Sequence, residues 1–81
     1  MSRASDSLIK SLSKAVRSRR LKAGLSQEDL AFEAEIHPTY VSLVERGKRN
    51  PTILVLAALA RALGTSMTSI IREVEAGVDG G

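Results

Sequence analysis

Glycine and proline divide this sequence into short segments, each no longer than a modest helix. Gly24, Gly47 and Gly64 each follow a run whose apolar residues have near-helical spacing, while Pro38 and Pro51 each stand at the start of one. Glycine commonly ends a helix, and proline is tolerated at its first position. The pattern predicts five helices and no strand: 6–22, a segment capped by Ser26 that ends near 34, 38 to about 46, a segment capped at 50–52 that ends at 63, and 67 to about 76.

The connections between these segments are short, which favours a compact all-α five-helix bundle. One domain is expected over residues 6–76, with a flexible N-terminus at 1–5. The glycine-rich residues 77–81 are expected to form a disordered tail. The tightest connection is the one around Ile36, between the second and third helices. Two short helices joined in this way form a helix-turn-helix unit.

The chain has 81 residues, no cysteine and one histidine, His37. Disulfides are therefore excluded and a structural zinc site is implausible, which leaves oligomerisation as the natural supplement to a small core. The longest apolar run, residues 53–60, is far shorter than the roughly 20 residues of a membrane span. We expect a cytoplasmic protein with no membrane contact, no cofactor, no metal and no small-molecule ligand.

Charge is segregated along the chain, whose formal net charge is +3. Residues 10–22 contain six basic side chains and no acidic one, and residues 46–49 hold a second basic cluster. Segregation of this kind suits a partner with a negatively charged surface. Ordinary solvated helix faces are the alternative.

The segment SQEDLAFEAEIHPTYVSLVERGKRNPT, residues 26–52, resembles the helix-turn-helix of the Cro and phage-repressor (XRE) family. The resemblance extends from about Leu8 to Val74, and the start of the third helix and its Arg-Asn exit are similar to restriction-modification controller proteins. It implies the lambda-repressor-like fold, in which the second and third helices form the helix-turn-helix. The family commonly has glycine in the turn, where this chain has Glu35; a left-handed backbone there costs glutamate on the order of 1 kcal/mol relative to glycine.

The N-terminal residues of a helix in the major groove reach base edges. Thr39 is the first candidate for a base contact, through its hydroxyl or its methyl group. Tyr40 either contacts DNA or packs against the second helix, and Ser42 either touches the groove or is a small spacer. His37 either donates to DNA or only caps the helix. The resemblance to controller proteins favours a guanine contact for Arg49.

Phosphate contacts position such a protein on DNA. Gln27 lies at the start of the second helix, where free N–H groups and the helix dipole favour an anion. Glu45 is expected to hold a nearby arginine rather than to face DNA. The remaining phosphate candidates, for which solvent exposure is an alternative explanation in the first helix, are Arg46, Lys48, Arg17, Arg20 and Lys22.

The fourth and fifth helices are too apolar for the edge of a small bundle. We expect a self-complementary two-fold interface that places two recognition helices about 34 Å apart on a near-palindromic double-stranded DNA site. The alternative is that the fifth helix folds back on the fourth within one subunit. The interface candidates are Leu54, Val55, Met67, Ile70, Ile71 and Val74.

The sequence therefore predicts a homodimeric, sequence-specific transcriptional regulator, and the resemblance to controller proteins suggests restriction-modification genes as its targets. An enzyme is disfavoured, because no catalytic constellation or phosphate-binding glycine loop is present. The alternative function is an antitoxin-type module that binds a toxin partner and regulates its own operon. A non-specific nucleoid binder would need no shaped surface on the third helix.

Overall fold

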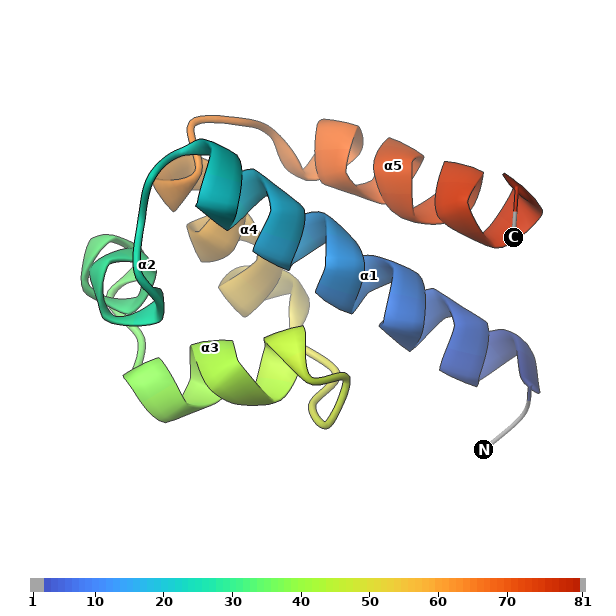
Figure 1. Cartoon of the computed structure of the whole chain (residues 1–81), viewed down its shortest axis with the longest axis horizontal. Coiled ribbons are helices and arrows are strands. Elements are labelled where there is room, and N and C mark those ends of the chain that lie inside the picture. The colour runs from blue at the N-terminus through green and yellow to red at the C-terminus, as the bar shows by residue number, and fades with distance from the viewer. Residues whose placement is uncertain (1–2, 81) are drawn as a thin grey trace.

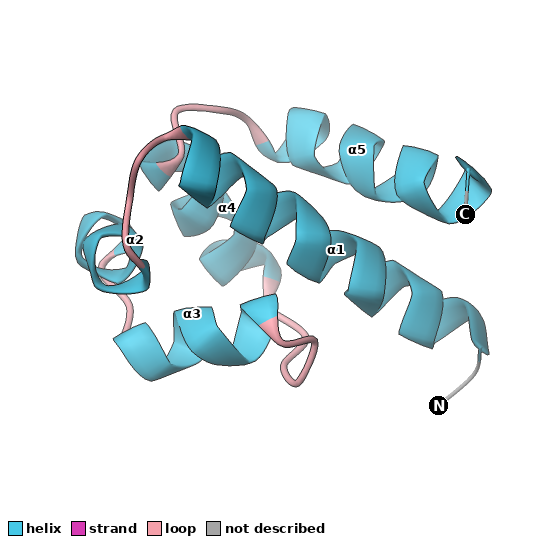
Figure 2. Cartoon of the chain, in the orientation of Figure 1, coloured by secondary structure: helices cyan, strands magenta, loops and turns pink. Residues whose placement is uncertain are grey.

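A computed structural model describes residues 3–80 of the chain, and these residues form five helices and no strand (Figures 1 and 2). The helices are α1 (Arg3–Lys22), α2 (Gln27–Ala34), α3 (Pro38–Glu45), α4 (Ile53–Ala62) and α5 (Met67–Gly80). The long α1 crosses the molecule, with α5 along one side of it and α3 on the other (Figure 1). The all-α five-helix architecture is as the sequence predicts.

Two predicted helix boundaries differ from those in the structure. Helix α1 begins at Arg3 and not at residue 6, and α5 continues to Gly80 and does not end near residue 76. The flexible N-terminus at 1–5 and the disordered tail at 77–81 stay predictions. Positions 1, 2 and 81 of those two segments lie outside the described residues. The last turns of α5 lie along α1, where Ser11 Oγ donates a hydrogen bond to the Val74 carbonyl at 2.7 Å. A Cβ at Gly77 would collide with Ser11 Oγ, so this glycine permits a close helix contact instead of ending the helix.

The core consists of two clusters of buried side chains that meet along α1. Val16 points into the larger cluster, which α1 shares with α2, α3 and α4, and its neighbour Ala15 points into the smaller one, which α1 shares with α4 and α5. The helix-turn-helix unit is therefore packed on one side of α1 and α5 on the other. The fully buried side chains Leu30, Val41, Val44 and Leu59 fix α2 and α3 against α1 and α4.

The first four helices each end in a left-handed residue, at Gly24, Glu35, Gly47 and Gly64. Just after α2, the Ile36 N–H donates a hydrogen bond back to the Ala31 carbonyl at 3.0 Å, which is the six-to-one bond of a Schellman motif. Glu35 is the one non-glycine residue with positive φ among residues 3–80, at φ 58° and ψ 41°. Glu35 therefore adopts the left-handed backbone that favours glycine.

No single helix within residues 3–80 has both the length and the apolar character that crossing a membrane requires. Helices α4 and α5 reach that length only when taken together, across a bend of 103°.

Candidate nucleic-acid interface

The N-terminus of α2 is fixed by a complete capping box. Ser26 Oγ accepts a hydrogen bond from the Asp29 N–H at 2.9 Å, and the Asp29 carboxylate accepts one from the Ser26 N–H at 3.1 Å. These bonds satisfy two backbone N–H groups, one at the N-cap and one in the first turn of α2. They also lower the pKa of the Asp29 carboxyl, chiefly through the hydrogen bond from the Ser26 backbone. Aspartate thus fills a place where glutamate is more common.

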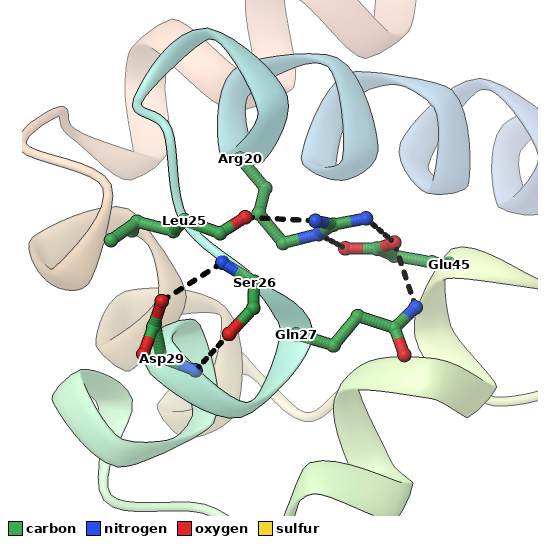
Figure 3. Close-up of polar contacts among 6 residues, drawn as sticks. All are labelled: Arg20, Leu25, Ser26, Gln27, Asp29 and Glu45. Carbon is green, nitrogen blue, oxygen red and sulfur yellow. Dashed lines mark hydrogen bonds and ion pairs between the residues drawn. The ribbon is translucent and has the colours of Figure 1, made fainter.

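A buried ion pair joins α1 to the end of α3 (Figure 3). The Arg20 guanidinium donates from Nε to Glu45 Oε2 at 2.6 Å and from NH2 to Glu45 Oε1 at 2.9 Å. Its remaining nitrogen donates to the Leu25 carbonyl at 2.9 Å, and Glu45 Oε1 also accepts from Gln27 Nε2 at 3.1 Å. One carboxylate therefore holds α1, the start of α2 and the end of α3 together.

The prediction that Arg20 contacts phosphate is wrong for this arrangement. Its side chain is only 10% exposed and all of its nitrogen atoms are directed to protein oxygens. The hydrogen-bonded Glu45 carboxylate raises the pKa of Arg20 above its ordinary value, and this outweighs the opposite effect of burial. Glu45 holds an arginine in place, as the sequence predicts.

Helix α3 presents its N-terminal turn to solvent. His37 is the N-cap, with Nδ1 accepting a hydrogen bond from the Thr39 N–H at 3.0 Å, and Pro38 follows as the first helical residue. The neutral ring therefore carries its proton on Nε2, which is left as a donor. His37 and Thr39 are exposed, and Ser42 is half-buried on the same helix. Four of the five base-reading candidates thus belong to α3 or its N-cap, since Tyr40 also lies on this helix.

Two of the base-reading candidates, Tyr40 and Arg49, contact each other. The Arg49 guanidinium carbon lies 5.3 Å from the centroid of the Tyr40 ring, within cation–π range. Tyr40 is half-buried and packs against the larger core cluster, so the packing role weighed for it is present. Its other role, a DNA contact, remains a prediction.

The side chains of the remaining phosphate-contact candidates differ in exposure and in whether they are already hydrogen-bonded within the protein. Gln27 is half-buried and bonded to Glu45, and the exposed Arg46 donates from Nε to Ser42 Oγ at 3.2 Å. Three further basic side chains are exposed: Arg17, Lys22 and Lys48. All five stay predictions as phosphate contacts.

The predicted dimer residues divide into two groups. Ile70 and Val74 are 0% and 4% exposed in the smaller core cluster, where they pack within one subunit against Ala15 of α1 as well as Ala60 of α4. The alternative that α5 folds back on α4 is thus correct in part for these two, because α1 is the larger partner of α5. Val55 and Met67 are half-buried against the core clusters. Leu54 and Ile71 are exposed, and they remain candidates for a subunit interface.

Two residues with structural or surface roles, Arg19 and Ile53, were not anticipated from the sequence. Arg19 links α1 to the middle of α5 and to the loop before it, donating from Nε to Glu73 Oε1 at 2.8 Å and from NH1 to Thr65 Oγ1 at 3.1 Å. Ile53, which is 70% exposed, lies beside Leu54 on α4. A helical-wheel projection of the apolar run on α4 would have placed Ile53 on the solvent-facing side. No local sequence pattern indicates the Arg19 contacts, because they join residues far apart in the chain.

A helix-turn-helix family model matches residues 16–70, which run from the C-terminal part of α1 to the first turn of α5. The chain belongs to the helix-turn-helix family. Its relatives in this family include control protein C.BamHI of Bacillus amyloliquefaciens, 42% identical over 69% of this chain and 70% of that protein. Control protein C.SmaI of Serratia marcescens is 45% identical over 74% of this chain and 71% of that protein.

Solved structures agree with this assignment. A chain from the crystal structure of the restriction-modification controller protein C.Esp1396I tetramer, in complex with its natural 35 base-pair operator, superposes with a TM-score of 0.80. It is 31% identical, over 88% of this chain and 93% of that one. The clp gene regulator ClgR of Corynebacterium glutamicum has a TM-score of 0.83 at 30% identity, over 89% of this chain and 77% of that one. This helix-turn-helix chain is a DNA-binding transcriptional regulator of the XRE type.

Proposed function

We propose that this regulator binds a near-palindromic double-stranded DNA operator as a homodimer and controls the genes of a restriction-modification system. The similarity to control proteins supports the choice of target genes. The protein acts by binding rather than by catalysis, in the cytoplasm where its DNA lies. It needs no cofactor or small-molecule ligand.

The observation that carries the DNA contact is the surface formed by the start of α3 and the loop after it. Exposed His37 and Thr39 supply hydrogen-bonding groups, and Arg49 lies over the ring of Tyr40, the residue that follows Thr39 on α3. An arginine reads a guanine edge with two hydrogen bonds, and a threonine contacts a base edge or a thymine methyl. This surface is where the family's recognition helix meets the major groove.

Backbone contacts support the pose on DNA. Gln27 stands at the N-terminus of α2, where the helix dipole favours a phosphate, and Glu45 orients its amide. Exposed Lys48 and Arg46 continue the positive surface beyond α3. Phosphate contacts of this kind determine the affinity for DNA and its salt dependence, whereas the α3 surface determines which base sequence is recognised.

Selection from random duplexes, with Thr39→Ala and Arg49→Ala proteins beside the wild type, tests the proposal. We expect a two-fold symmetric motif that is relaxed at particular bases by each change, with a loss of about 5- to 150-fold for the selected site. Lys14→Ala, which removes an exposed positive charge from α1, is the matched control and should leave the motif unchanged. Recovery of no motif, with binding that only fades as salt rises, would contradict sequence-specific reading.

A further inference from the structure

An apolar groove runs between α4 and α5 and continues onto α1. Its first part, a hollow of about 480 Å³, is lined mainly by Ile53, Leu56, Met67 and Ile71. A second hollow of about 290 Å³ shares Leu56 and Ile71 with the first and extends to α1. We call the first part the α4–α5 groove. Ile53 and Ile71 are 70% and 40% exposed, so a substantial apolar surface is uncovered.

Two opposite charges also line this groove. Arg72 and Glu75 lie three residues apart on the exposed face of α5. Within the described part of the chain, neither side chain has an ion pair or hydrogen bond. Their neighbour Glu73 does have a partner, Arg19, on the side of α5 that faces α1. The groove therefore presents a free cation and a free anion next to its apolar centre.

This pair of charges is complementary to itself. In an antiparallel contact between two α5 helices, a two-fold axis between positions 72 and 75 places Arg72 opposite Glu75 of the partner subunit. The same axis places Glu75 opposite Arg72 of the partner subunit, so both ion pairs form or neither does. An isologous interface needs this kind of self-complementarity. DNA would meet the anion as well as the cation, and a ligand with a single charge would leave one of them without a partner.

We propose that Arg72 and Glu75 select a second copy of this chain as the occupant of the α4–α5 groove, through two symmetry-related ion pairs across an antiparallel α5–α5 contact. The inference rests on the homodimer of the proposed function and names what sets its register. The apolar residues provide most of the contact energy, and the charges exclude other registers and other partners of similar shape.

Charge reversal provides a test that does not depend on the contact energy alone. R72E places two like-charged pairs in its own homodimer, and so does E75R. A mixture of the two proteins restores both attractive pairs in the heterodimer. We expect each single variant to dimerise at least about 10-fold more weakly than the wild type, and their equimolar mixture to recover wild-type affinity.

The measurement is sedimentation velocity over a concentration series, with one variant carrying a fluorescent label to identify the heterodimer. K14E and E33R reverse exposed charges outside the groove and should dimerise like the wild type. In 1 M salt, where the screening length is about 3 Å, the difference between wild type and single variants should shrink.

A variant that separates the two proposals is I53E, which puts a charge into the apolar part of the groove. If the wild type is dimeric and I53E is monomeric, the homodimer is supported. If R72E and E75R then dimerise like the wild type, the ion-pair inference is overturned and the homodimer stands. Weak single variants whose mixture stays weak overturn it as well. A wild type that remains monomeric at all concentrations, including on DNA, overturns the homodimer and this inference together.

Discussion

Arg20 and Glu45 form a two-pronged ion pair, 2.6 Å between Nε and Oε2, although 25 positions separate them in the chain. The side chains are 10% and 3% exposed, so the pair lies almost entirely out of water. Through the bond from Gln27 to Glu45, the same pair sets the position of a side chain at the proposed phosphate contact. Stability and DNA binding are therefore coupled at this carboxylate.

Removal of one partner leaves a buried charge without compensation, so Arg20→Ala should lower the free energy of unfolding by about 3–5 kcal/mol. The double variant Arg20→Met, Glu45→Met should lose much less, because an apolar pair of similar size can replace a buried ion pair. Urea denaturation of the two proteins measures both effects. Equal losses in the single and double variants would show that the buried carboxylate, once left alone, carries no penalty.

Tyr40 and Arg49 should act on DNA as a coupled pair. Tyr40→Leu removes the aromatic face that holds the guanidinium, whereas Tyr40→Phe keeps it. In a double-mutant cycle on operator affinity, Tyr40→Leu and Arg49→Ala should be coupled by about 0.5–1 kcal/mol. Additive losses would mean that the two side chains contact DNA independently, and the Tyr40→Phe protein reports the separate role of the phenol hydroxyl.

Gly77 and Ser11 provide a second coupled pair. Gly77→Ala alone should give little or no stabilisation, because its Cβ displaces Ser11 Oγ from the Val74 carbonyl and so loses a hydrogen bond of about 1 kcal/mol. In a Ser11→Ala background the clash is absent, and Gly77→Ala should stabilise the protein by up to about 1 kcal/mol through helix propensity. Thermal unfolding of the four proteins checks the cycle. A full stabilisation by Gly77→Ala in the wild-type background would show that α5 does not approach α1 closely.

Glu35 has a left-handed backbone that costs most L-amino acids free energy. Glu35→Gly should therefore stabilise the protein by about 1 kcal/mol, and Glu35→Ala, which keeps the backbone cost, should not. Denaturant titration of the three proteins measures the difference. If alanine and glycine stabilise equally, the effect comes from loss of the carboxylate and not from backbone strain.

The Asp29 carboxylate supports the capping box only while it is ionised. Its pKa is lower in the folded chain than the ordinary 3.8, so its stabilising contribution is complete above that value and is lost as the pH falls through the folded pKa. Asp29→Ala should lower the melting temperature at pH 7 and make no difference once the pH is below the folded pKa. A constant difference across this range would assign the effect to packing and not to the charge.

Local sequence was enough to predict the number of helices, most of their ends and the place of the helix-turn-helix. Those features depend on nearby chemistry: the Ser26 and Thr52 caps, Pro38 at the first position of α3, and glycine at left-handed helix ends. The tail after Ala76 is the exception. Its glycines indicate disorder by composition, whereas the structure continues α5 to Gly80, with Gly77 against Ser11 of α1.

Helix packing, rather than any local pattern, sets which charged and apolar side chains are free to act. Arg17 and Arg20 belong to one basic run, yet Arg17 is exposed and Arg20 is paired with Glu45. Ile70 and Ile71 are adjacent and equally apolar, yet Ile70 is fully buried and Ile71 is 40% exposed. Neighbours on a helix differ by about 100° in direction, so a composition or a charge run cannot separate them. The elements that pack on either side of the helix make that choice.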